Sequence, residues 1–163
     1  MYGIPNRKLE RSVVERRVAL VRELGIVFEL GVDVTNPAVA AELDDFDAVV
    51  VAAGARAPRG LSAANVDAPG VVCAVDYLTA STVSVLDGSE PAVNARGLDV
   101  VVIGGGDTGN DCVGTAVRQG AHSVRPLEFL PAAPDTRAAR TPWPQWTTAN
   151  KTDTGHHGAI SAQ

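Results

Sequence analysis

The sequence predicts an α/β fold in which a buried strand leads into a glycine-rich turn and then into a helix. Two observations carry this prediction. Residues 100–103 are four consecutive β-branched apolar residues, which is typical of a buried strand of a parallel sheet. The residues that follow have the spacing Gly-x-Gly-x-x-Gly and are Gly104, Gly105, Gly106, Asp107, Thr108 and Gly109.

This glycine turn has the spacing of a dinucleotide-binding loop. Gly104 would permit the tight turn, Gly106 would let a pyrophosphate approach the backbone, and Gly109 would let the following helix pack closely on the strand. The pyrophosphate would then accept hydrogen bonds from N–H groups at the N-terminus of the helix. The alternative is a glycine-rich turn without a ligand.

The residues after the turn predict the rest of a strand, helix, strand unit. Residues 110–119 contain no proline, and Gly120 is expected to end their helix. Residues 123–130 form an extended segment before Pro131. We therefore expect a Rossmann-like dinucleotide-binding unit with a parallel sheet.

The N-terminal part predicts one helix and two strands. Ser12 and Glu15 have the spacing of a capping box, and Gly25 is expected to end the helix. Three valines would form its apolar face: Val14, Val18 and Val21. Residues 26–30 indicate a short strand, and residues 46–55 indicate a strongly buried strand that ends in small residues.

A change of composition separates these two parts. Residues 56–70 are rich in proline, glycine and alanine, which is typical of a connection. Residues 77–86 favour a short helix, and residues 87–97 favour a loop. The predicted domains are a partial FAD-binding domain at 1–56, a connecting segment at 57–97, a partial NAD(P)H-binding unit at 98–150 and a divergent tail at 151–163.

Composition limits the possible classes of function. The 163 residues are 45% hydrophobic, which is enough for a core. Fourteen basic and nineteen acidic residues give a net charge of −5, so neither nucleic acid nor an anionic membrane is an expected partner. No run of about 18 apolar residues indicates a membrane helix, and a cytoplasmic protein is expected. Cys73 and Cys112 lack metal-ligand spacing and are expected to be buried thiols.

Other candidate groups have simpler explanations. A cluster of acidic residues is expected to be a solvated turn and consists of Asp44, Asp45 and Asp47. His156 and His157 lie near Asp153, but adjacent side chains point apart, and we expect no metal site there. Trp143 and Trp146 are expected to pack on the coenzyme domain or on a partner surface. We predict no catalytic residue.

Signals for the type of nicotinamide coenzyme conflict. Glu128 lies 24 positions after Gly104, and an acidic residue near that spacing binds the ribose 2′-hydroxyl of NADH. Arg125 lies in the same predicted strand, and Arg137 and Arg140 follow in a loop, where arginine favours the 2′-phosphate of NADPH. Both coenzymes therefore stay candidates.

Several long motifs resemble the small, electron-input subunit of glutamate synthase. They are MYGIPN at 1–6, VVERR at 13–17, GGDTGNDCVG at 105–114 and PWPQW at 142–146. The similarity covers approximately residues 1–153.

The resemblance implies a flavoprotein oxidoreductase. In this family the small subunit takes hydride from NADPH or NADH onto FAD. It passes electrons through iron–sulfur clusters to a large subunit, which makes glutamate from glutamine-derived ammonia and 2-oxoglutarate. Hydride transfer between the two cofactors needs no catalytic dyad. By resemblance, the glycine turn binds the nicotinamide dinucleotide, and the segment near FAD is Ala52, Ala53, Gly54 and Ala55.

The chain also departs from the family. The family's cysteine-rich iron–sulfur region and its FAD-binding glycine motif lie upstream of the matching segment. Ala53 replaces a common threonine, and the similarity ends after Asp153. We therefore expect an internal fragment that binds FAD weakly or not at all and is inactive alone. The alternatives are a non-catalytic NAD(P)-binding module and an inert remnant of a disrupted gene.

Overall fold

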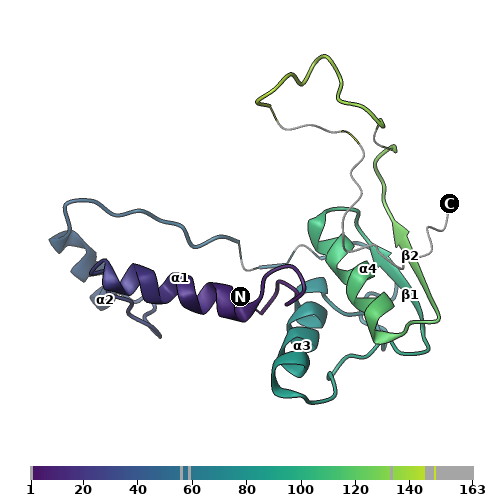
Figure 1. Cartoon of the computed structure of the whole chain (residues 1–163), viewed down its shortest axis with the longest axis horizontal. Helices are drawn as coiled ribbons and strands as arrows, with labels where there is room; N and C mark the ends of the chain where they lie inside the picture. The colour runs from purple at the N-terminus through teal and green to yellow at the C-terminus, as the bar shows by residue number, and fades with distance from the viewer. Residues whose placement is uncertain (1, 56, 59, 133, 146–148, 150–163) are drawn as a thin grey trace. The chain divides into compact units, whose positions relative to one another are not determined.

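The computed structural model describes residues 2–55, 57–58, 60–132, 134–145 and 149 (Figure 1). The chain forms two compact units. The first unit combines Met1–Leu9 with Gly70–Gln163, and the second is Glu10–Pro69. The assignment of residues 1–56 and 98–150 to two different cofactors stays a prediction.

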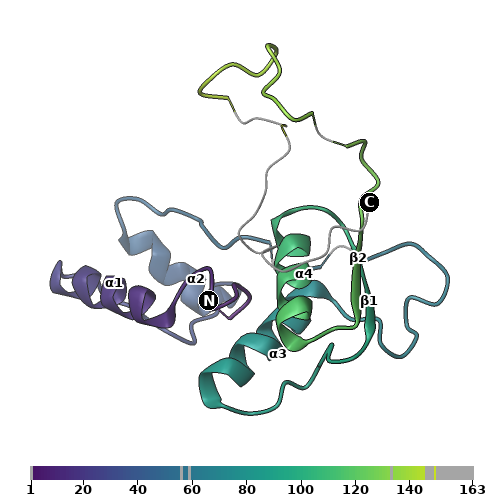
Figure 2. The same ribbon diagram turned by 45° about the vertical axis from the view of Figure 1, so that its right-hand side comes forward.

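The first unit contains the predicted strand, helix, strand arrangement. Strands β1 (Asp99–Ile103) and β2 (Ser123–Leu127) are parallel, with Val100 opposite Val124, and helix α4 (Asp107–Gln119) connects them. Figure 2 shows α4 beside the two strands and α3 (Ala74–Asp87) beside α4. The α/β fold with a partial Rossmann-like unit is therefore confirmed.

The ends of these elements differ from the predicted ones for local reasons. Helix α4 begins at Asp107 and not at residue 110, because Gly106 is already its N-cap and the last three residues of the glycine motif form its first turn. Strand β2 ends at Leu127 and not at residue 130, because the N–H groups of Phe129 and Leu130 donate to the Glu128 carboxylate. Gly120, with φ +84°, follows α4 as predicted.

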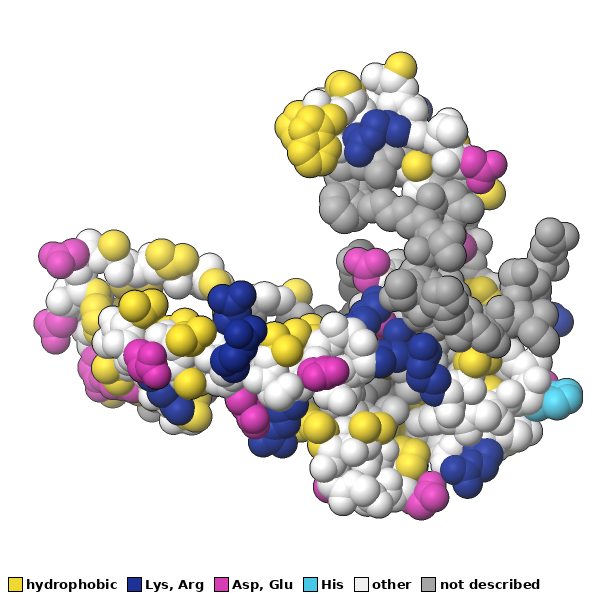
Figure 3. Space-filling view, viewed as in Figure 1, with side chains coloured by type: hydrophobic (Ala, Val, Ile, Leu, Met, Phe, Trp, Pro, Cys, Tyr) yellow, Lys and Arg dark blue, Asp and Glu magenta, His cyan; other side chains and the backbone are white. Residues whose placement is uncertain are grey.

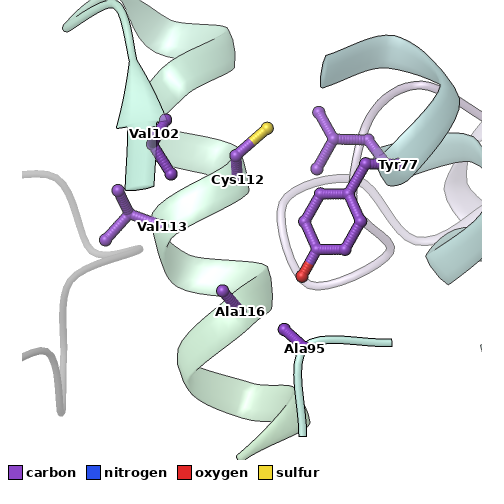
Figure 4. Close-up of a cluster of buried hydrophobic side chains, with 7 residues drawn as sticks. Tyr77, Ala95, Val102, Cys112, Val113 and Ala116 are labelled. Carbon is purple, nitrogen blue, oxygen red and sulfur yellow. The ribbon is translucent and has the colours of Figure 1, made fainter. Parts of the chain in front are cut away.

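The core of the first unit lies between α4 and its two neighbours. Figure 4 shows Val113 of α4 beside Val102 of β1, whereas Cys112 and Ala116 lie on the side of Tyr77 of α3. All of these side chains are buried. Small residues along α4 thus let a strand and a second helix pack against one helix.

Some residues that the sequence predicts to be buried are exposed. Val101 and Ile103 of β1 point away from the side of Val102, because successive strand side chains alternate between the faces of a sheet. Cys112 is buried, but Cys73 is exposed at the N-cap of α3. Trp143 does not pack on the described residues of the coenzyme domain, since this side chain is 83% exposed, and its packing on a partner surface stays a prediction. Trp146 lies outside the described residues.

The second unit contains α1 (Arg11–Glu23), a short α2 (Pro37–Glu42) and a 3₁₀ turn (Leu43–Asp45). The three predicted valines of α1 are its half-buried apolar face, and no residue of this helix is fully buried. Figure 3 shows hydrophobic side chains at the surface over α1 and α2. The acidic cluster is exposed, as the predicted solvated turn requires.

The predicted capping box of α1 is wrong. The N-cap is Glu10 and makes no side-chain capping bond, so Ser12 already lies inside the helix. Its hydroxyl lies 3.4 Å from a Glu10 carboxylate oxygen, and Glu15 pairs with Arg11 at 2.6 Å. The predicted end is correct, because Gly25 has φ +86° and donates its N–H to the carbonyl of Arg22.

Both strands predicted in the second unit are wrong. Residues 26–30 and 46–55 have no strand structure, and Val50 and Val51 are 88% and 85% exposed. A strand needs a neighbouring strand to pair with its backbone N–H and C=O groups. Among the described residues, β1 and β2 pair only with each other.

The described ranges contain neither a candidate membrane-spanning helix nor a candidate metal site. None of their helices combines the length and the apolar character of a membrane span. No group of three or more potential ligand residues within those ranges could hold a metal ion. His156, His157 and Asp153, where we expected no metal, lie outside the described residues.

Candidate nucleotide-binding site

The glycine turn connects the carboxyl end of β1 to the N-terminus of α4. Gly104 has φ +113°, a backbone conformation that side-chain-bearing residues rarely adopt. Its N–H donates to the carbonyl of Leu127 at 2.8 Å, which extends the pairing of β1 with β2 by one residue. The turn is therefore held to the sheet where it begins.

Gly109 and Gly106 lack side chains for different reasons. A Cβ atom on Gly109 would collide with the carbonyl oxygen of Gly104, so the first turn of α4 approaches the glycine turn closely. A Cβ atom on Gly106, the N-cap of α4, would meet no atom within 4 Å. Intramolecular packing thus explains the glycine at 109 but not the glycine at 106.

The N-terminus of α4 presents backbone hydrogen-bond donors. The N–H of Asn110 is already bonded to the carbonyl of Gly106. Within the described ranges, the N–H groups of Asp107, Thr108 and Gly109 have no acceptor, as is usual for the first turn of a helix. With the helix dipole, these three donors favour a bound anion.

Glu128 follows β2 and lies against the glycine turn. Its Oε2 accepts a hydrogen bond from the Gly105 N–H at 2.7 Å, and its Oε1 accepts from Phe129 and Leu130. These bonds, that of Leu130 foremost, hold the pKa of the Glu128 carboxyl below its usual range. A Cβ atom on Gly105 would collide with this carboxylate, so a side chain at this position would force Glu128 to move.

Other predicted site residues lie elsewhere in the chain. Arg137 donates from Nη1 to the carbonyls of Thr141 and Gln145, and no contact in the described ranges joins it to the glycine turn. Ala53, Gly54 and Ala55 belong to the second unit and have no strand structure.

Asp111 of α4 is a buried charged residue that the sequence did not single out. One of its carboxylate oxygens lies 2.8 Å from Lys8 Nζ and 3.4 Å from Arg7 Nη2. These ion pairs tie the segment Met1–Leu9 to α4 within the first unit. The sequence signal was an acidic residue directly before the buried Cys112 and Val113.

Cys112 lies inside this core and does not have the properties of a nucleophile. Burial, with a smaller contribution from the neighbouring Asp111 charge, raises the pKa of its thiol to about 11. A thiol with such a pKa carries little thiolate near neutral pH, and the thiolate is the reactive form. Cys112 is therefore not a candidate catalytic group, and the groups available at the glycine turn are backbone N–H donors and the Glu128 carboxylate.

Comparison with known proteins gives several relatives, among them the three that follow. The glutamate synthase [NADH] of Schizosaccharomyces pombe is 46% identical over 162 residues, which are 95% of this chain and 8% of the yeast protein. The glutamate synthase [NADPH] small chain of Bacillus subtilis is 47% identical over 152 residues, 88% of this chain and 30% of that protein. The glutamate synthase [NADPH] small chain of Mycobacterium tuberculosis is 43% identical over 162 residues, which are 95% of this chain and 33% of that protein.

The matches cover most of this chain but only part of each relative. The chain spans about a third of the length of the bacterial small chains and less than a tenth of the yeast protein. No protein-family model matches the chain.

Proposed function

We propose that this chain, which is a homologue of part of the glutamate synthase small chain, binds NADH or NADPH at its glycine turn. The pyrophosphate would accept hydrogen bonds from the first-turn N–H groups of α4. The proposed binding residues are those of the turn, together with Glu128 at the ribose: Gly104, Gly105, Gly106, Asp107, Thr108 and Gly109. Arg137 would contact the coenzyme only after leaving its present carbonyl partners.

The open space at Gly106 carries this proposal. Nothing within 4 Å of its missing Cβ atom requires a glycine, and the space adjoins N–H donors that have no acceptor among the described residues. A bound phosphate would use both features, because it needs close approach to the backbone as well as donors. When bound, the reduced nicotinamide supplies a hydride, and the chain's residues bind and orient it.

FAD belongs to the proposal only for an intact enzyme. Residues 46–55 form no strand, and the second unit has no buried residue in the part that the structure describes. Ala53, Gly54 and Ala55 therefore do not form an FAD site by themselves, and we expect no flavin in the purified chain. Nearly one flavin per molecule would contradict this.

Homology with glutamate synthases supports the proposal for the steps after hydride transfer. In an intact, cytoplasmic enzyme, electrons would leave through iron–sulfur clusters toward a large subunit that makes glutamate. The described residues of this chain contain no cluster-binding set of side chains. A nucleotide-binding module without flavin is the second candidate function, and the exposed residues 46–55 favour it.

Calorimetric titration of the full chain with NADH and NADPH tests the proposal. Gly106→Ala should abolish or strongly weaken binding, because the added methyl group enters the space for the phosphate. Gly60→Ala is the matched control, since a Cβ atom there also meets nothing within 4 Å. Melting temperatures of both variants show whether they stay folded. Unchanged binding in folded Gly106→Ala, or no binding of either coenzyme at millimolar concentration, would refute the proposal.

A further inference from the structure

The segment directly after β2 carries an exposed aromatic side chain. Phe129 is 91% exposed, and it follows Glu128, whose carboxylate is bonded to the glycine turn. A single exposed apolar side chain is common on protein surfaces, so exposure alone does not identify a site. The contacts of the Phe129 backbone and the character of the neighbouring side chains supply two further observations.

The backbone of Phe129 is joined to the glycine turn through the carboxylate of Glu128. The N–H of Phe129 donates to Oε1 at 2.8 Å, and the N–H of Leu130 donates to the same oxygen at 3.0 Å. The other oxygen, Oε2, accepts from the N–H of Gly105 at 2.7 Å. One side chain thus holds residues 128–130 against the loop for which we propose pyrophosphate binding.

Other side chains at this end of the sheet are also apolar and exposed. Ile103 and Leu127 are the last paired residues of β1 and β2, and both are exposed to solvent. Leu130, directly after Phe129, is exposed as well. The carboxyl end of the sheet therefore offers apolar surface next to the backbone donors of the glycine turn, a combination that is typical of small-molecule sites.

We propose that the phenyl ring of Phe129 stacks on the adenine ring of the coenzyme. This inference rests on the proposed function, in which Glu128 accepts a hydrogen bond from the 2′-hydroxyl of the adenosine ribose. Adenine is bonded to the ribose carbon next to the one that carries this hydroxyl, so it lies close to Glu128 and to the residue that follows. A phenyl ring offers the flat apolar face on which a purine base stacks.

Calorimetric titration of the full chain with NADH, ADP and inorganic pyrophosphate tests the stacking. ADP carries the adenine, the ribose and two phosphates, whereas pyrophosphate carries no base. Phe129→Ala should weaken the binding of NADH and of ADP by about tenfold, because it removes the ring on which the base stacks. Pyrophosphate binding should be unchanged, since the variant keeps the backbone N–H that donates to Glu128.

Three further variants separate stacking from a general effect of apolar surface. Phe129→Trp keeps an aromatic face and should keep the affinity for NADH and ADP. Phe129→Leu keeps an apolar side chain without a ring and should lose affinity for both. Phe46→Ala is the matched control, because it removes another exposed phenylalanine that belongs to the second unit, and it should change none of the three affinities.

The possible failures are distinguishable. Unchanged affinity of Phe129→Ala or of Phe129→Leu for NADH and ADP would overturn the stacking and leave the proposed coenzyme site intact. An equal loss of pyrophosphate affinity in Phe129→Ala would also overturn it, because the ring would then act on the glycine turn and not on the base. No binding of NADH to the unchanged chain would refute the coenzyme site and the stacking together.

Discussion

The carboxylate of Glu128 accepts a hydrogen bond from the backbone N–H of Gly105, with 2.7 Å between Oε2 and the nitrogen. This bond joins the end of β2 to the glycine turn and places a negative charge beside it. Each carboxylate oxygen can accept more than one hydrogen bond, so Glu128 can keep this bond and still bind a ribose hydroxyl.

The position of Glu128 predicts a preference for NADH over NADPH. A ribose 2′-hydroxyl can donate to the carboxylate, whereas a 2′-phosphate would be repelled by it. We expect NADH to bind about tenfold more tightly, or ~1.4 kcal/mol. Glu128→Gln should reduce this ratio toward one. Titration of the unchanged chain and of Glu128→Gln with NADH and NADPH measures this ratio of affinities. Tighter binding of NADPH than of NADH to the unchanged chain would contradict the prediction.

The same residue predicts a pH dependence of stability. Backbone N–H groups lower the pKa of Glu128 from 4.5 in the folded chain, so its carboxylate stabilises the fold above that pH. This contribution should fall as the pH drops below about 4.5 and disappear below the lowered pKa. Melting temperatures of the unchanged chain and of Glu128→Gln should therefore differ at pH 7 and approach each other as the pH falls below about 4.5.

A difference in melting temperature between these two proteins that does not shrink as the pH falls below about 4.5 would contradict that explanation. Other carboxyl groups with a lowered pKa do not disturb the comparison, because both proteins contain them: Asp33, Asp87 and Asp99.

Gly109→Ala should destabilise the first unit. The new methyl group would collide with the backbone carbonyl of Gly104, which cannot move without disturbing the pairing of Gly104 with Leu127. We expect a loss of about 1–3 kcal/mol in the free energy of unfolding. Urea denaturation checks this, with Gly60→Ala as the control in open space. Equal stability of the two variants would show that α4 does not approach the turn so closely.

The ion pair between Lys8 and Asp111 should show measurable coupling. The side chains are 26% and 11% exposed, so water screens the pair less than a surface pair. A double-mutant cycle with Lys8→Ala and Asp111→Ala should give about 1–2 kcal/mol. The exposed pair Arg11 and Glu15 is the control and should give less than about 0.5 kcal/mol. Purely additive effects of Lys8→Ala and Asp111→Ala would contradict the predicted coupling.

Local sequence signals predicted the part of the fold that positions the candidate site. The β-branched run gives β1, and the glycine spacing gives the turn and the start of α4. Gly120, in the left-handed conformation, ends that helix. Each of these signals acts within a few residues of the structure that it specifies.

The features that the sequence did not predict depend on distant residues. Residues 46–55 have the composition of a buried strand, but a strand also needs a neighbour, and none pairs with them in the described ranges. Asp111 binds Arg7, which lies 104 positions earlier in the sequence. The spacing placed Glu128 at the candidate site, but its hydrogen bond with the N–H of Gly105, 23 positions earlier, was not predicted.

The most direct test of the central claim is the backbone amide NMR spectrum of the ¹⁵N-labelled chain during titration with NADH. The first-turn donors of α4 should show the largest shifts, namely the amides of Asp107, Thr108 and Gly109, because the pyrophosphate would accept their hydrogen bonds. The amides of residues 46–55 should not shift. Unchanged first-turn amides at a saturating NADH concentration, or shifts confined to another part of the chain, would contradict the account.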